Sequence, residues 1–190
     1  LHAALRRLNT AERNICAVED PVEMEVPGVT QVAVNRRAGL DFSEALRAFL
    51  RQDPDVIMVG EIRDPETANI AVKAAQTGHR VLSTLHTRTA PAAVERLTQM
   101  GVAPYDLASS LNLVIAQRLV RRLCPHCQGA GGEGEPAPGC QACPDGYSGR
   151  CGIFQALQVT ADIAEGILAG ESSRELAARA AAAGIEDLYT

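Results

Sequence analysis

The sequence of 190 residues predicts an α/β fold, a parallel sheet with flanking helices. Short apolar runs alternate with amphipathic helical segments through residue 123. The run at 56–59 has no polar interruption, as in a strand that is buried on both faces of a sheet. Short connections join these segments into strand–helix–strand units, in which the two strands must be parallel.

Three strands and a helix are predicted in the first 59 residues. Short strands are expected at 15–18 and 30–34, where apolar residues gather. Asp41 begins a helix, because its carboxylate can accept a hydrogen bond from the backbone N–H of Glu44. The Glu44 side chain can in turn accept one from the backbone N–H of Asp41, as in a capping box. The apolar run at 56–59 is the next strand.

A strand–helix–strand unit comes next. Asp64 and Pro65 start its helix, since the carboxylate caps free backbone N–H groups and proline suits the first turn. The helix stops at Gly78, and a strand follows at 80–85. Another helix then runs to Gly101.

The character of the sequence changes near residue 124. Before it, a long helix is expected over 105–123. After it, residues 128–139 contain Gly, Pro and Glu with almost nothing to bury, which predicts a flexible loop. A strand at 153–157 and two helices follow, the second opened by a capping box at Ser172.

Composition and charge exclude several classes of protein. The chain has 18 basic and 23 acidic residues and a net charge of -5, so it lacks the positive field that attracts phosphates. Aromatic residues make up 3% and Trp is absent, which gives no base-stacking surface. No apolar run approaches the ~20 residues needed to cross a bilayer. We therefore expect a cytoplasmic protein that does not bind nucleic acid.

Four of the six cysteines form two CxxC pairs. The pairs consist of Cys124, Cys127, Cys140 and Cys143. This spacing is typical of a tetrahedral structural zinc site, and four protein ligands leave no open position for catalysis. Paired disulfides or an empty site are the alternatives. Cys16 is expected to lie in the core. His126 and Cys151 are expected to take no part, with Cys151 as a spare ligand the alternative.

Polar side chains follow three of the predicted strands. Glu19 ends the first strand, Glu61 comes after Gly60 at the end of another, and His86 follows the last. Because the carboxyl ends of parallel strands share one edge, where open α/β folds bind ligands, these side chains should converge. A carboxylate there can hold Mg²⁺ or polarise an attacking water. One such acid often merely begins a loop, but three polar strand ends favour a functional site.

Four stretches of the chain resemble motifs of the type II secretion and type IV pilus assembly ATPases, in the bacterial secretion-ATPase superfamily. Residues 14–23 resemble its Asp box, LRQDPDVIMVGEIRDPETA its Walker B region, TGHRVLSTLHT its His box, and AQRLVRRLC the helix before its metal-binding insertion. The resemblance implies a partial RecA-like P-loop NTPase core over 1–123. It further implies a tetracysteine zinc insertion over 124–150 and a truncated C-terminal helical part over 151–190.

The resemblance also implies roles for single residues. Glu19 matches the acid that activates the hydrolytic water, Glu61 the glutamate near Mg²⁺, and His86 the imidazole that senses the γ-phosphate of ATP. The implied set that binds ATP and Mg²⁺ comprises Asp20, Glu23, Gly60, Glu61 and His86. Arg88 stands where the family often has asparagine, so no role is carried over to it.

The phosphate-binding loop of P-loop enzymes requires the motif GxxxxGK[ST]. Lys73 is the single lysine among the 18 basic residues, and it lies within a predicted helix. The motif is therefore not in this chain. We expect the chain to be a fragment of a longer motor that hydrolyses no ATP by itself, and a degenerate paralogue is the other interpretation.

The resemblance implies that the complete protein is a cytoplasmic homo-hexamer that couples ATP hydrolysis to the assembly of pilins or pseudopilins. It would associate peripherally with the inner membrane through an assembly platform protein and its cytoplasmic adaptor. The run GYSGRCGIFQALQVT gives a small preference for pilus extension over type II secretion. The alternative is a non-catalytic zinc-ribbon binding module.

Overall fold

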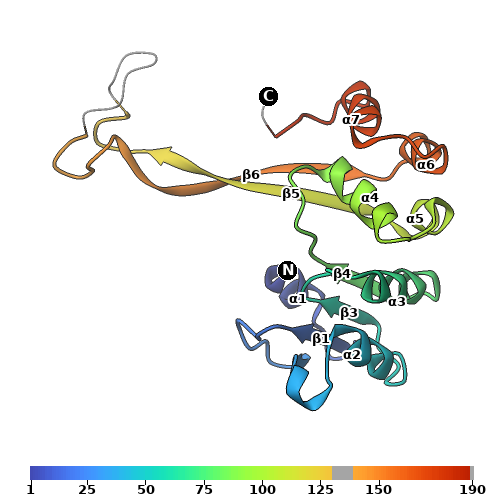
Figure 1. Cartoon of the computed structure of the whole chain (residues 1–190). Helices are drawn as coiled ribbons and strands as arrows, with labels where there is room; N and C mark the ends of the chain where they lie inside the picture. Colours follow the sequence, from blue (N-terminus) through green and yellow to red (C-terminus); the bar gives the residue numbers. More distant parts are fainter. Residues whose placement is uncertain (130–138, 189–190) are drawn as a thin grey trace.

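The structure, a computed structural model, describes residues 1–129 and 139–188. A sheet with its helices forms one part, and further helices pack at the base of a long hairpin (Figure 1). The first part contains α1 (His2–Leu8), β1 (Ile15–Glu19), β2 (Thr30–Ala33), a 3-10 turn (Arg36–Ala38), α2 (Phe42–Phe49), β3 (Val56–Val59), α3 (Pro65–Gln76) and β4 (Arg80–Ser83). The second contains α4 (Ala90–Gln99), α5 (Pro104–Ser110), β5 (Leu113–Leu123), β6 (Tyr147–Gln158), α6 (Ala161–Leu168) and α7 (Ser173–Ala182).

The sheet has the strand order β2-β1-β3-β4, and every neighbouring pair is parallel. Val18 lies opposite Val59, and Val59 lies opposite Ser83, so β1, β3 and β4 end at the same edge. The predicted α/β class with a parallel sheet is confirmed. This edge holds the residues that follow the three strands.

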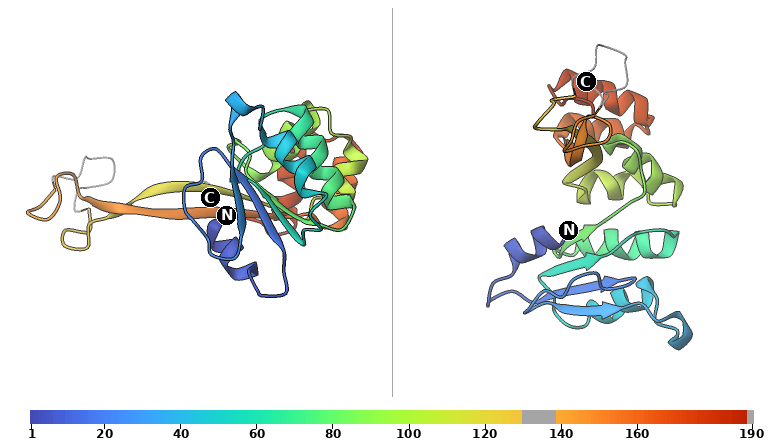
Figure 2. Two further views of the ribbon diagram at one scale, coloured as in Figure 1. Left: turned by 90° about the horizontal axis from the view of Figure 1, so that it is seen from below. Right: turned by 90° about the vertical axis from the view of Figure 1, so that its left-hand side faces the viewer.

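Both faces of the sheet are covered, as the uninterrupted apolar run predicts. Successive side chains of a strand point to opposite faces. On one face, Leu5 of α1 packs against Ile15, Ala17, Val56 and Met58. On the other, α2 and α3 cover Cys16, Val18, Ile57 and Val59. Figure 2 shows α1 on the side of the sheet opposite to α2 and α3.

The predicted helix starts are largely confirmed. Asp41 accepts a hydrogen bond from the backbone N–H of Glu44 at 2.9 Å, but the Glu44 carboxylate pairs with Arg47 instead of completing a capping box. Asp64 caps α3 through its carboxylate. The capping box at Ser172 is complete.

The prediction of one helix over 105–123 is wrong. The helix α5 ends at Ser110, Leu111 is extended, and Leu113–Leu123 forms the strand β5. Within β5, Ala116 is buried between the exposed residues Ile115 and Gln117, an alternation that suits a strand. Pairing with β6 supplies the backbone hydrogen bonds that a helix would otherwise make, so tertiary contacts decide the structure here. The stretch AQRLVRRLC is therefore a strand rather than the expected helix.

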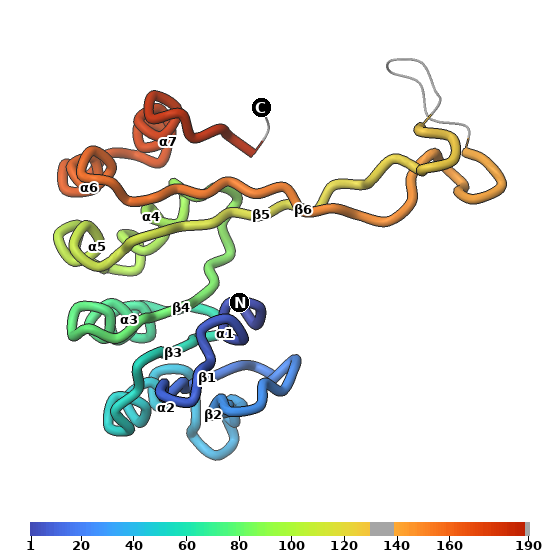
Figure 3. Tube along the Cα trace, turned by 180° about the vertical axis from the view of Figure 1, so that it is seen from behind, coloured from blue at the N-terminus to red at the C-terminus, as the bar shows by residue number. Residues whose placement is uncertain are grey.

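The strands β5 and β6, with the described residues between them, form a feature that we call the arm. They pair antiparallel from Leu113 opposite Gln158 to Leu123 opposite Tyr147. The predicted strand at 153–157 is the inner part of β6. The arm extends well beyond the helices at its base (Figure 3). Most of the loop predicted at 128–139 lies outside the described residues.

The helices α6 and α7 follow the arm, whereas residues 151–158 of the predicted C-terminal helical part lie in β6. Arg179 of α7 donates to both carboxylate oxygens of Glu171 at 2.7 Å and to Asp162 of α6 at 2.5 Å. These bonds join the two helices and the turn between them. Within the described residues, no helix combines the length and the apolar character needed to span a membrane.

Candidate functional site

The shared edge of the sheet carries an acid–imidazole pair. Glu61 follows β3, and His86 lies in the segment 84–89 that joins β4 to α4, which we call the His86 loop. The Nε2 atom of His86 lies 2.9 Å from Oε2 of Glu61, and Nε of Arg63 lies 2.5 Å from the same oxygen. The Glu61 side chain is 12% exposed and that of His86 is 76% exposed. The predicted convergence of these two strand ends is thus present in the structure.

Two opposing effects set the charge of Glu61. Burial raises the pKa of its carboxyl group, but hydrogen bonds from Arg63 and His86 outweigh burial and hold the pKa below its ordinary value. Glu61 is therefore ionised at neutral pH. An ionised carboxylate is the oxygen ligand that Mg²⁺ takes in proteins.

Glu19 at the end of β1 has its own partners. Its side chain is 5% exposed. Nε2 of Gln31 donates to Oε1 of Glu19 at 2.7 Å, and Nε2 of His2 lies 2.9 Å from Oε2, an ion pair when the imidazole is protonated. Without such partners, a buried carboxylate would be strongly destabilising. The hydrogen bond from Gln31 on β2 fixes the direction of this carboxylate, and His2 of α1 lies against its other oxygen.

Gly60 lets the strand ends come close together. Its N–H donates to the carbonyl of Val18 at 2.8 Å. A Cβ atom on Gly60 would lie 3.2 Å from that carbonyl oxygen and 3.3 Å from Cα of Glu19. On the other side, the hydroxyl of Thr84 donates to the carbonyl of Gly60 at 2.6 Å. The residue before Glu61 is thus tied to both neighbouring strand ends.

The other acids predicted for this site have different surroundings. Asp20 pairs with Nη2 of Arg36 at 3.3 Å. Glu23 is exposed in the loop that follows. The structure thus brings Glu61 and His86 into contact and places Asp20 and Glu23 on the neighbouring loop.

Sequence reasoning missed three residues that hold the two acids. Arg63 comes two positions after Glu61 in the same motif, so its charge was a usable local signal. His2 and Gln31 reach Glu19 only because α1 and β2 flank β1 in the fold. No local pattern in the sequence reports that arrangement.

The four predicted cysteines meet at the far end of the arm. All their sulfur atoms lie within 4.8 Å of one another. The separations are 3.9 Å for Cys124 and Cys140, 3.6 Å for Cys127 and Cys143, and 3.7 Å for Cys140 and Cys143. A tetrahedral zinc ion with Zn–S bonds of about 2.3 Å holds its sulfur ligands about 3.8 Å apart. The residues therefore fit a structural zinc ion.

The thiols of this cluster have unlike environments. Backbone N–H groups of Cys127 and His126 lower the pKa of Cys124, whereas burial raises the pKa of Cys143. Metal binding requires deprotonated thiols, so zinc would remove this difference. Among the described residues, the cluster contains only the four CxxC cysteines, without Cys16 or Cys151.

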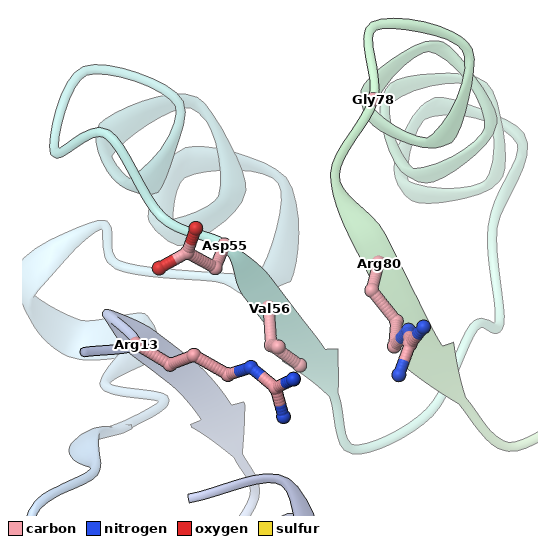
Figure 4. Close-up of a pocket in the computed structure, with 5 residues that line it drawn as sticks. All are labelled: Arg13, Asp55, Val56, Gly78 and Arg80. Atoms are coloured by element: carbon pink, nitrogen blue, oxygen red, sulfur yellow. The ribbon is translucent and has the colours of Figure 1, made fainter. Parts of the chain in front are cut away.

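A separate cavity of about 200 Å³ lies at the amino ends of the strands. Arg13, Asp55, Val56, Gly78 and Arg80 line it (Figure 4). Asp55 is held by a hydrogen bond of 2.7 Å from the backbone N–H of Asn14. The cavity is at the edge of the sheet opposite to Glu61 and His86, so it does not belong to their site.

Comparison with known protein families gives a match over the whole chain. A family described as "Type II/IV secretion system protein" matches residues 1–190. The chain is 51% identical to the protein transport protein HofB homolog of Escherichia coli (strain K12), covering 100% of this chain and 44% of that protein. It is 52% identical to the type II secretion system protein HxcR of Pseudomonas aeruginosa, covering 99% and 40%. It is 49% identical to the type IV pilus assembly ATPase PilB of Pseudomonas aeruginosa, covering 100% and 37%.

Two solved structures are also similar to this chain. The crystal structure of the pilus retraction motor PilT with bound ADP has a TM-score of 0.71 and 29% identity, covering 94% of this chain and 48% of that chain. The structure of the Legionella pneumophila ATPase DotB has a TM-score of 0.64 and 25% identity, covering 92% and 45%. The chain spans less than half the length of each of these relatives and solved chains.

Proposed function

Because the chain belongs to the type II/IV secretion system protein family, we propose that it is part of an ATP-driven motor for protein secretion or pilus assembly. The observation that carries this proposal is the contact of 2.9 Å between Glu61 and His86 at the carboxyl edge of the sheet. Open α/β folds bind their ligands at that edge. The relatives, which are named as transport, secretion and pilus assembly proteins, agree with it.

In this proposal the acids and the imidazole have separate roles in binding and hydrolysing ATP. When bound, Mg²⁺ would neutralise charge on the phosphates. Glu61, held ionised by Arg63 and His86, would hold the ion directly or through water. Glu19 would orient the attacking water, and the exposed ring of His86 would contact the γ-phosphate. Asp20, Glu23 and Gly60 would complete the nucleotide site.

The four cysteines would hold a structural zinc ion in the same protein. Their sulfur separations and the absence of an open coordination position support this role. The ion would stabilise the end of the arm and take no part in hydrolysis.

We extend the proposal to the oligomeric state and the partners of the complete protein. The complete protein would be a cytoplasmic homo-hexamer that associates peripherally with the inner membrane through an assembly platform protein and its adaptor. Relatives of similar identity come from both pilus assembly and type II secretion, so the preference for pilus extension is supported only by the sequence around β6.

The first prediction concerns the chain alone. We expect no ATP turnover from the purified 190-residue chain, because it has no GxxxxGK[ST] motif to bind the phosphates. Release of inorganic phosphate, with the Glu61→Gln variant as a control for contaminating ATPases, measures this. Turnover that disappears in the variant would contradict the prediction.

A chimera tests the motor function itself. This chain would replace the matching segment of PilB in one strain and of HxcR in another, so that each relative supplies the rest of the motor. We expect ATP hydrolysis and restored pilus assembly or secretion, both lost with Glu61→Gln. A chimera that folds and binds ATP but neither hydrolyses it nor restores either process would overturn the proposal. The process that is restored more fully would identify the system.

A further inference from the structure

The His86 loop is held at two ends by different parts of the molecule. At its start, the hydroxyl of Thr84 donates to the carbonyl of Gly60, and the carbonyl of Thr84 accepts from the backbone N–H of Ile62 at 3.0 Å. These bonds tie the loop to the residues around Glu61. Its other end runs into α4, away from the sheet.

The second end is fixed by a side chain from the arm. Thr89 occupies the N-cap position of α4, but its side chain makes no cap hydrogen bond. The side-chain oxygen of Gln155 on β6 accepts from the N–H of Ala90 at 3.0 Å instead. Ala90 is fully buried and Gln155 is 4% exposed. Gln155, which lies 65 residues further along the chain, therefore supplies the hydrogen-bond acceptor that an N-cap side chain would otherwise provide.

A second arm residue holds the same end of the loop. Nη2 of Arg118 on β5 donates to the backbone carbonyl of Arg88 at 2.7 Å. In the hairpin, Ala116 lies opposite Gln155 and Arg118 lies opposite Ile153, so the two polar residues occupy diagonal positions on the paired strands. The two strands of the arm thus bind Arg88, two residues before α4, and Ala90, the first residue of α4.

We propose that Gln155 and Arg118 are positioning residues that hold the His86 loop so that His86 reaches Glu61. The loop then spans a fixed distance between the sheet and the arm, with the imidazole between its two anchored ends. Burial supports this role for Gln155, because a buried amide is retained only where it makes a hydrogen bond, and an apolar residue would pack there without one. The importance of His86 for ATP rests on the proposed function, but its positioning does not.

Hydrogen exchange and NMR relaxation of the 190-residue chain test this inference. In Gln155→Leu, amides in the first turn of α4 should exchange about tenfold faster or more, since a buried donor loses its acceptor. Carbon relaxation should show greater motion of the His86 ring, and amides of β1 and β3 should be unchanged. Arg118→Met should also increase the motion of the His86 ring, which keeps the inference testable if Gln155→Leu does not fold.

Matched variants separate positioning from general stability. Gln158→Leu and Arg122→Met change exposed residues on the same strands and should have no effect. Equal acceleration of exchange throughout the sheet, or an unchanged His86 ring in both Gln155→Leu and Arg118→Met, would overturn the inference. No nucleotide is used, so failure of the proposed ATPase function leaves the outcome of this test unaffected.

Discussion

At the scale of single residues, Gly60 explains how the ends of β1 and β3 and the His86 loop come close together. It contacts the end of β1 through its N–H and the His86 loop through its carbonyl. The space beside it is limited by backbone atoms of Val18 and Glu19, which cannot turn aside as a side chain can. The close approach of Gly60 to the end of β1 therefore depends on the absence of a single methyl group.

Gly60→Ala should be destabilising for this reason. Its Cβ would contact backbone at 3.2 Å and 3.3 Å, and overpacking of this kind typically lowers the free energy of unfolding by about 1–3 kcal/mol. Urea unfolding measures the loss. A variant as stable as the parent would show that β1 and β3 move apart at no cost.

Some residues of the candidate site could be predicted from the sequence, and others could not. The strand-end rule placed Glu61 and His86 at one edge, because it depends only on parallel strands. The CxxC spacing identified the four sulfur atoms that meet in the arm. The partners of Glu19 and the anchors of the His86 loop could not be predicted, because they come from elements whose positions the local pattern does not contain.

At the scale of elements, the arm is the feature that local reasoning misjudged. Residues 113–123 have apolar positions compatible with either a helix or a strand, and pairing with β6 decides between them. The helices α2, α3 and α4 were predicted closely, because each begins beside a capping residue or a proline, and glycines follow the ends of α3 and α4. Local signals therefore sufficed for helices and failed for a strand whose partner is far along the chain.

Gly139 next to the first cysteine of the second pair should be essential for the metal site. It has φ of +76°, and a Cβ there would lie 2.5 Å from the carbonyl oxygen of Pro144. Gly149 has φ of +75° with nothing within 4 Å, so Gly149→Ala is a matched control for backbone strain alone. We expect Gly139→Ala to weaken zinc binding far more than Gly149→Ala in a competition assay with a chromophoric chelator. Equal affinities in the two variants would contradict this.

The pair of α6 and α7 should lose stability in acid. Hydrogen bonds from Arg179 hold the pKa of Glu171 below its ordinary value, despite opposition from burial. A group with a lowered pKa stabilises the fold above its ordinary pKa, and this contribution is lost as the pH falls through the lowered value. Between pH 5 and 3, the melting temperature of the parent should therefore fall more than that of Glu171→Gln. Parallel curves for the two proteins would refute the assignment.

At the scale of the whole molecule, the sheet and the end of the arm are separate structural units. The core of the sheet is built from apolar side chains of β1, β3 and the helices on both faces. The end of the arm is centred instead on four sulfur atoms. The family resemblance predicted both units, whereas the way in which the arm holds the His86 loop required the three-dimensional structure.

Removal of zinc should therefore act locally. We expect one zinc ion per chain by elemental analysis, and none in the double variant Cys124→Ser with Cys140→Ser. Without zinc, amides around the cysteines should exchange rapidly while those of β1 and β3 keep their protection, because the core does not include the metal site. Loss of protection throughout the sheet would show that the two units fold together.

The shape of the arm has a mechanical consequence. The strand β5 has 11 residues, which at about 3.3 Å per residue gives a length of roughly 35 Å. Its base is bonded to the His86 loop and its far end carries the sulfur cluster, beyond the helices (Figure 3). Displacement by a rotation grows with distance from the axis. A small rotation of the arm about its base, beside the His86 loop, would therefore displace the cysteines by much more than it displaces the residues of the loop.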